Sequence, residues 1–333
     1  MTQTGPAPAD KFADLVLEGG GVRGIGLAGA IITLDEAGYR FKRVAGTSAG
    51  AIAASVVVAL QKTRTPMSQL QAILGTIDFK RFMQKSALRK ALGAVGDAEH
   101  LLLHMGVYDG DYLIEWLSDA LTQLGAPAHF SDYKEVDPAA DSTKVDNAYP
   151  LVVTTSDITR GKSVRLPWDY AQYGLDPDKQ RLVDAVRASM SIPFFFEPIR
   201  FRSPAIAGPP AFDAGTVTWV DGGLLDNFPV DVFDRTDGQP SRWPTIGIKL
   251  SARTVVPTKP ANTDGTINEA IACLHTALDN ADRFYVTEDR AKRTIFVDNC
   301  GVKSTDFNLP AGDQKALYDS GVAAAKDWLA SHP

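Results

Sequence analysis

The chain has 333 residues and a net charge of −6, from 34 lysines and arginines against 40 aspartates and glutamates. This balance argues against a nucleic-acid-binding surface and against general attraction to anionic lipid, so any peripheral membrane contact has to be local. The two cysteines form no C-x-x-C pair and no zinc-type spacing with histidine, which predicts a reducing compartment and no structural metal.

Neither the first residues nor the apolar runs of the chain read as a targeting or membrane-spanning segment. Residues 1–11 lack the basic start and apolar middle of a secretory signal peptide. The longest apolar runs are shorter than a membrane span. We therefore expect a cytoplasmic protein. Its length would allow two domains, but α/β folds of this size often form one, and we expect a single domain over residues 10–333.

A glycine-rich loop follows the first predicted strand. Residues 14–17 form a short apolar strand, and the chain then reads Glu-Gly-Gly-Gly-Val-Arg-Gly from Glu18 to Gly24. Residues 25–37 predict a helix that ends at Gly38. Consecutive backbone amides in such a loop form a concave nest, which suits either a phosphate or a developing oxyanion.

Gly19, Gly21 and Gly24 also match the G-x-G-x-x-G pattern of a dinucleotide-binding loop. Such a site requires an acidic residue at the end of the next strand, about 20 positions further on. Val-Ala-Gly stands there instead, at residues 44–46, and the strand runs into a second glycine turn. An oxyanion loop therefore fits better than a dinucleotide site.

The second turn places a serine between two glycines. Gly46 and Gly50 lie two residues to either side of Ser48, after an apolar strand and before an alanine-rich helix over residues 49–60. This is the G-x-S-x-G pattern of a nucleophile elbow, in which a strained turn exposes the hydroxyl at the start of a helix. The pattern alone is equally typical of an ordinary turn of small residues.

Residues 66–149 predict a mostly helical cap inserted into the domain. It contains an amphipathic helix at residues 112–124 and a polar loop at residues 136–150. Residues 79–92 form a basic amphipathic stretch, which either rests on lipid headgroups or packs against the body of the protein. Its cationic residues are Lys80, Arg81, Lys85, Arg89 and Lys90.

The second half of the chain alternates strands and helices, which predicts a parallel-type sheet with ligands at the carboxyl ends of its strands. Strands are expected at residues 151–155, 162–166, 217–220, 245–250 and 294–297, and helices at residues 182–190, 267–288 and 311–330. Three phenylalanines at residues 194–196 are expected in the core rather than along a fatty-chain tunnel. Asp221 ends the strand at 217–220 and begins Asp-Gly-Gly.

A nucleophilic serine needs a proton acceptor. A triad of Ser48, Asp221 and His275 has the order of an α/β-hydrolase, although His275 lies in a helical context. Asp221 can also accept the proton directly if burial raises its pKa from about 3.9, or it can serve only to form the Asp-Gly turn. The remaining histidines show no metal-site pattern: His100, His104, His129 and His332.

Three motifs in this order, the Glu18–Gly24 loop, Gly46-Thr-Ser-Ala-Gly50 and Asp221-Gly-Gly, resemble those of the patatin-like phospholipase family. The resemblance covers residues 14–60, 185–198 and 219–230, is looser at 151–166, and has no signature at 66–149. It implies a three-layer α/β/α fold with a central, mostly parallel sheet, and hydrolysis of acyl esters of phospholipids or related lipids. It also implies a Ser48–Asp221 dyad without histidine or metal, and an oxyanion hole from Gly19, Gly20 and Gly21.

These expectations combine into one mechanism. Asp221 takes the proton of Ser48 as the hydroxyl attacks an ester carbonyl, and the Ala49 amide joins the glycine loop in holding the oxyanion. Arg23 either meets a lipid phosphate or reinforces the local positive field. No cofactor and no nucleic acid enter this prediction; the alternatives are a Ser-Asp-His esterase using His275 and a lipid-binding regulator without turnover.

Overall fold

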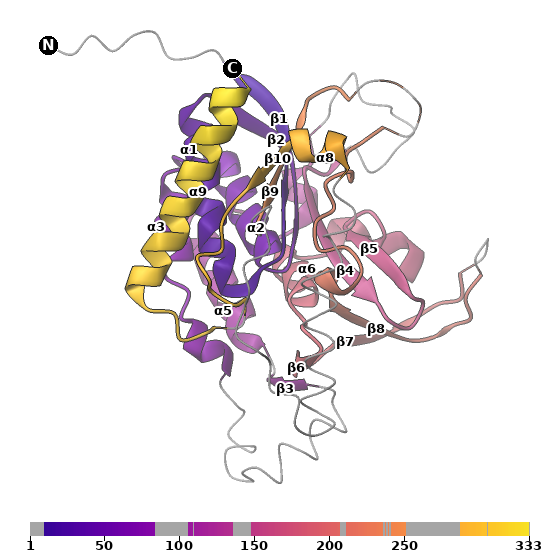
Figure 1. The fold of residues 1–333 in the computed structure, drawn as a ribbon. Coiled ribbons are helices and arrows are strands. Elements are labelled where there is room, and N and C mark those ends of the chain that lie inside the picture. The colour runs from indigo at the N-terminus through magenta and orange to yellow at the C-terminus, as the bar shows by residue number, and fades with distance from the viewer. Residues whose placement is uncertain are drawn as a thin grey trace, which may run out of the picture.

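The computed structural model describes residues 10–83, 106–108, 110–135, 148–206, 211–235, 237, 239, 241–250, 287–304 and 306–332 (Figure 1). Several predictions lie outside these residues. They concern residues 84–92 of the basic stretch, His100, His104, residues 267–286 of an expected helix, and His275 within it.

An eight-stranded sheet forms the centre of the described structure, in the order β10-β9-β1-β2-β4-β8-β7, with β5 paired to β4. Its parallel part comprises β1 (Lys11–Leu17), β2 (Tyr39–Thr47), β4 (Leu151–Asp157), β9 (Thr245–Lys249) and β10 (Thr294–Phe296). The antiparallel strands are β5 (Lys162–Leu166), β7 (Ile199–Ser203) and β8 (Gly215–Asp221). The predicted strands are thus confirmed, within a mixed and mostly parallel sheet.

Helices flank the sheet, which confirms the predicted three-layer α/β/α arrangement. The described α-helices are α1 (Ile25–Glu36), α2 (Ala49–Thr63), α3 (Gln69–Leu74), α5 (Asp111–Gln123), α6 (Leu182–Ser189), α8 (Glu288–Lys292) and α9 (Ala311–Ser331). The longest of them, α9, lies along α1 on one side of the sheet (Figure 1). The ends of α1, α5, α6 and α9 fall within one residue of their predicted positions.

Both faces of the central strands β4 and β9 are buried, and successive side chains along a strand point to opposite faces. Leu15 and Leu17 of β1 join the larger core under α1, α2 and α6, whereas Val16 between them faces the opposite side. There Val16 packs with the chain that follows β8, including Phe228 and Val230. The segment after Asp221 is therefore fixed against the sheet, close to the ends of the parallel strands.

The described parts of residues 66–149 are mostly helical. They comprise α3, a 3₁₀ helix over Phe79–Met83, β3 (Gly106–Tyr108), α5 and a 3₁₀ helix over Phe130–Tyr133. β3 pairs with β6 (Phe194–Phe196) outside the main sheet. That this region caps the catalytic domain stays a prediction.

The described start of the basic stretch packs on the body of the protein. The ring of Phe82 is buried between Tyr112 and Phe196. The Arg81 guanidinium lies 4.2 Å from the centroid of the Tyr112 ring and 3.5 Å from the carboxylate of Glu115. These contacts favour the packed alternative for residues 79–83. Within the described residues, no helix combines the length and the apolarity needed to cross a bilayer.

Candidate active site

Ser48 occupies a strained turn between β2 and α2. Its backbone has φ 53° and ψ −121°, a conformation that non-glycine residues rarely adopt. A Cβ on Gly46 would lie 2.2 Å from the carbonyl oxygen of Gly50, so only glycine lets the strand end and the helix start pass this closely. The nucleophile-elbow geometry predicted from the sequence is present at Ser48.

The side chains of Ser48 and Asp221 are hydrogen-bonded. Ser48 Oγ lies 2.8 Å from Asp221 Oδ2, and the Gly223 amide donates to Asp221 Oδ1 at 2.7 Å. The sheet register brings them together: Thr47 of β2 pairs with Thr154 of β4, and Thr155 pairs with Asp221 at the end of β8. One strand therefore separates two residues that are 173 positions apart in the chain.

The carboxyl group of Asp221 is strongly desolvated. Only 3% of the residue is exposed, and 5% of Ser48. Burial raises the pKa of Asp221 to about 7, because it outweighs the hydrogen bonds from Gly223 and Ser48, which lower the pKa. At neutral pH this carboxyl group is balanced between its neutral and ionised forms, as suits a general base or acid.

The glycine loop lies beside Ser48. A Cβ built on Gly19 would be 3.2 Å from Ser48 Cβ, and one on Gly24 would be 3.1 Å from Ala49 Cβ. The Gly19 amide donates to the carbonyl of Asn227 at 3.1 Å, so it is already engaged. In the described part of the chain, no hydrogen bond occupies the amides of Gly20, Gly21 or Ala49.

Two contacts fix the shape of this loop. Gly21 has φ +55°, and a Cβ there would lie 2.0 Å from the carbonyl oxygen of Ser304, which accepts the Val22 amide at 3.1 Å. Arg23, for which a phosphate or field role was expected, donates from Nε to the Gly20 carbonyl at 3.2 Å. Arg23 thus holds the backbone of the loop.

Sequence reasoning missed the role of Asn227. Its backbone oxygen accepts the Gly19 amide, and its side-chain Nδ2 donates back to the Gly19 carbonyl at 3.3 Å. Asn227 therefore ties the segment after Asp221 to the glycine loop. The only signal in the sequence is its place six residues after Asp221, in the same turn-rich stretch.

A buried ion pair was also missed. Glu18, the first residue of the glycine motif, accepts from Lys249 Nζ and from the Leu250 amide at the end of β9. Each of the two charged residues is 4% exposed. The pair fastens the end of β1 to the end of β9, immediately before the loop turns toward Ser48.

The two described histidines make their contacts with residues other than Ser48 and Asp221. His129 forms a backbone bridge with Arg181, and the His332 ring stacks on Trp328 at 4.2 Å. Among the residues that the structure describes, no group of three or more histidines, cysteines or acidic residues is placed to bind a metal.

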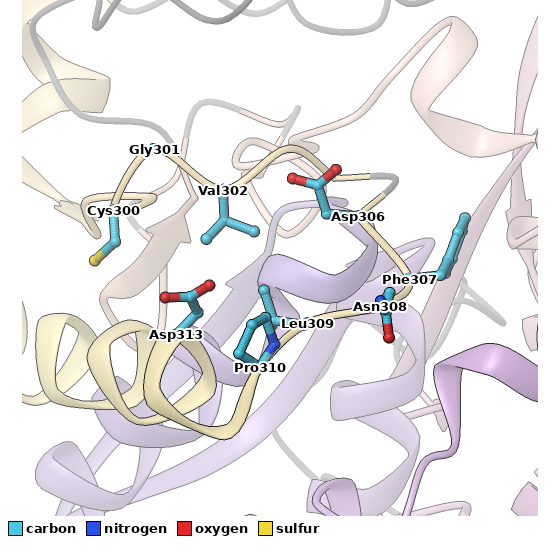
Figure 2. A pocket seen from close by; sticks show the side chains of 9 residues that line it. All are labelled: Cys300, Gly301, Val302, Asp306, Phe307, Asn308, Leu309, Pro310 and Asp313. Carbon is cyan, nitrogen blue, oxygen red and sulfur yellow. The ribbon is translucent and has the colours of Figure 1, made fainter.

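A hollow of about 440 Å³ lies next to the glycine loop. Figure 2 shows the nine residues that line it, from Cys300 to Asp313, and neither Ser48 nor Asp221 is among them. Two of them, Val302 and Phe307, pack with Val22 of the loop. This hollow is therefore a neighbour of the site rather than the site itself.

The fold and the Ser48–Asp221 pair define a class of α/β/α proteins with a serine nucleophile elbow. Comparison with known proteins gives the family: residues 15–234 match the model of the patatin-like phospholipase family. The chain is also 33% identical over 318 residues to the protein YqhO of Bacillus subtilis (strain 168), across 96% of this chain and 98% of YqhO. This protein belongs to the patatin-like phospholipase family, as its three motifs predicted.

The solved structure of VipD shares the fold. VipD from Legionella pneumophila aligns with a TM-score of 0.53 at 17% identity, over 98% of this chain and 67% of VipD. The type III effector protein ExoU aligns with a TM-score of 0.47 at 15% identity, over 97% of this chain and 53% of ExoU. At this level of identity, the likeness to VipD concerns the architecture alone.

Proposed function

We propose that this protein is a serine acyl hydrolase that cleaves fatty-acyl ester bonds of phospholipids or lysophospholipids through Ser48 and Asp221. The observation that carries the proposal is the 2.8 Å contact between Ser48 Oγ and a buried carboxylate with a raised pKa. Membership of the patatin-like phospholipase family supports the class of substrate.

The first half of the reaction forms an acyl-enzyme. The ionised Asp221 takes the proton of Ser48 as Oγ attacks the ester carbonyl carbon, and the carbonyl oxygen becomes an oxyanion. Protonated Asp221 then gives this proton to the departing alkoxide, which leaves as the lysophospholipid or glycerol-phosphate alcohol. In the second half, water attacks the acyl-serine, Asp221 takes its proton and returns it to Ser48, and the fatty acid leaves.

Backbone amides stabilise the oxyanion in this proposal. Gly20 and Gly21 of the loop and Ala49 at the start of α2 supply the donors, since their amides are not engaged elsewhere in the described structure. The Gly19 amide, expected as a fourth donor, instead holds the loop against Asn227. The positive end of the α2 dipole adds to the same field. We assign Arg23 to the support of the loop rather than to a lipid phosphate.

A fluorophosphonate probe and a lipid mixture test the proposal together. Wild-type protein should react with the probe at Ser48 and release fatty acid from phosphatidylcholine or lysophosphatidylcholine, as read by mass spectrometry. Ser48→Ala should lose both signals. Ser55→Ala, which removes a buried hydroxyl bonded to Ala51 within α2, should keep both and serves as the matched control.

Two other outcomes would select the alternatives. Turnover that survives in Asp221→Asn and disappears in His275→Ala would favour a Ser-Asp-His esterase. Purified wild-type protein that binds lipid vesicles but hydrolyses neither phospholipids nor short-chain esters would favour a lipid-binding regulator. Either result would overturn the proposal that Ser48 and Asp221 hydrolyse the ester without a histidine.

A further inference from the structure

The last residue of α6 contacts the backbone of Ser48. Ser189, the final residue of this helix, is fully buried. Its Oγ accepts the backbone amide of Ser48 at 2.8 Å and donates to the carbonyl of Thr154 at 2.6 Å. One hydroxyl group therefore joins the strained serine turn to β4, the strand that lies between Ser48 and Asp221.

The next two residues, Met190 and Ser191, also contact Ser48 and Asp221. Met190 Sδ lies 3.4 Å from Ser48 Oγ, on the hydroxyl that Asp221 also contacts. The carbonyl of Ser191 accepts the backbone amide of Asp221 at 2.8 Å. Between them, Ser189 at the end of α6 and the two residues after it thus contact both Ser48 and Asp221.

This turn is itself held firmly. Arg187, 4% exposed, donates from Nη1 to Ser191 Oγ at 2.6 Å and from Nη2 to the carbonyl of Glu197 at 2.9 Å. Ser191 Oγ in turn donates to the Arg187 carbonyl at 3.0 Å. A side chain locked by such surrounding hydrogen bonds can hold a reactive group within the narrow limits that catalysis requires.

We propose that Ser189 is a positioning residue, which holds the strained backbone of Ser48 through its amide so that Oγ points at Asp221. The inference rests on the proposed function and extends it. A residue with positive φ keeps its conformation only where the surroundings over-determine it, and the Ser189 hydroxyl is the acceptor that the Ser48 amide uses. Without that acceptor, the turn relaxes and Oγ moves away from the carboxylate.

A matched pair of variants isolates the hydroxyl. Ser189→Thr and Ser189→Val add side chains of the same shape to the same buried position, but only threonine can accept the Ser48 amide. We expect Val to lower kcat by about 100-fold, the loss typical of a misplacement near 1 Å, with KM within about twofold. Thr should keep kcat within about fivefold of wild type, and equal kcat values for Thr and Val would overturn the proposal.

Two further readouts separate positioning from folding and from the proposed function. Ser189→Ala adds no volume and should reproduce the Val effect on kcat, so a loss seen in Val alone would mean overpacking and would also overturn the inference. Hydrogen exchange at the Ser48 amide should be slow in wild type and Thr and fast in Val, whether or not any ester is cleaved. If wild-type protein hydrolyses no ester, the proposed function fails; if exchange is equally slow in Val, the positioning role fails.

Discussion

The substitution Asp221→Asn should stabilise the fold at alkaline pH while it removes activity. Burial raises the pKa of Asp221 from 3.8 to about 7. Between pH 4 and pH 7, the folded protein holds a proton on this group that the unfolded chain has released. Unfolding therefore releases a proton in this range, and the contribution of Asp221 to stability falls as the pH rises.

The size of the effect follows from the pKa difference. At about 1.36 kcal/mol for each pKa unit, a rise from 3.8 to about 7 corresponds to about 4 kcal/mol. Asparagine stays neutral at every pH, so it lacks this penalty. The free energy of unfolding of Asp221→Asn, taken relative to wild type, should increase by up to about 4 kcal/mol between pH 4 and pH 8 and then level off.

Urea unfolding of both proteins at several pH values from 4 to 8.5 measures this difference, and all other titrating groups cancel in the subtraction. The variant should gain on wild type between about pH 4 and pH 7, the range between the two pKa values of Asp221. Stability curves that stay parallel across this range would refute the reasoning, because Asp221 would then titrate alike in the folded and unfolded chains.

Two other substitutions test the support of the site. Gly46→Ala should cost about 1–3 kcal/mol of stability and slow fluorophosphonate labelling, whereas Gly215→Ala, whose Cβ meets no atom within 4 Å, should stay within about 0.5 kcal/mol of wild type. Glu18→Gln should cost about 3–5 kcal/mol, because the buried Lys249 ammonium loses its carboxylate, and Lys249→Met in the same chain should recover most of this loss. Equal urea midpoints for either compared pair would contradict the corresponding account.

Most of the strands, though not β3 or β7, most of the helices and the position of the serine turn were predictable from the sequence. Buried strands leave continuous apolar runs, and the turn at Ser48 requires glycines because of close backbone approach. Asp221 was predictable as a strand-end carboxylate within a recognisable motif. These features are local, so the amino-acid pattern itself reports them.

The partners that support the site were not predictable in this way. Glu18 and Lys249 are 231 residues apart, and they meet only because β1 and β9 are neighbours in the sheet. Ser189 bonds to Ser48 because α6 packs against β4, and no spacing in the sequence indicates this packing. The occupied amide of Gly19 likewise depends on where the chain after β8 returns to the glycine loop.

The dependence of kcat/KM on pH tests the direct transfer of a proton from Ser48 to Asp221 most directly. Because the base must be ionised, wild-type kcat/KM on a soluble ester should rise through a single ionisation near pH 7 and then level off. This ionisation should persist in His275→Ala and be absent from the residual activity of Asp221→Asn. An ionisation near pH 7 that remains in Asp221→Asn and disappears in His275→Ala would contradict the account.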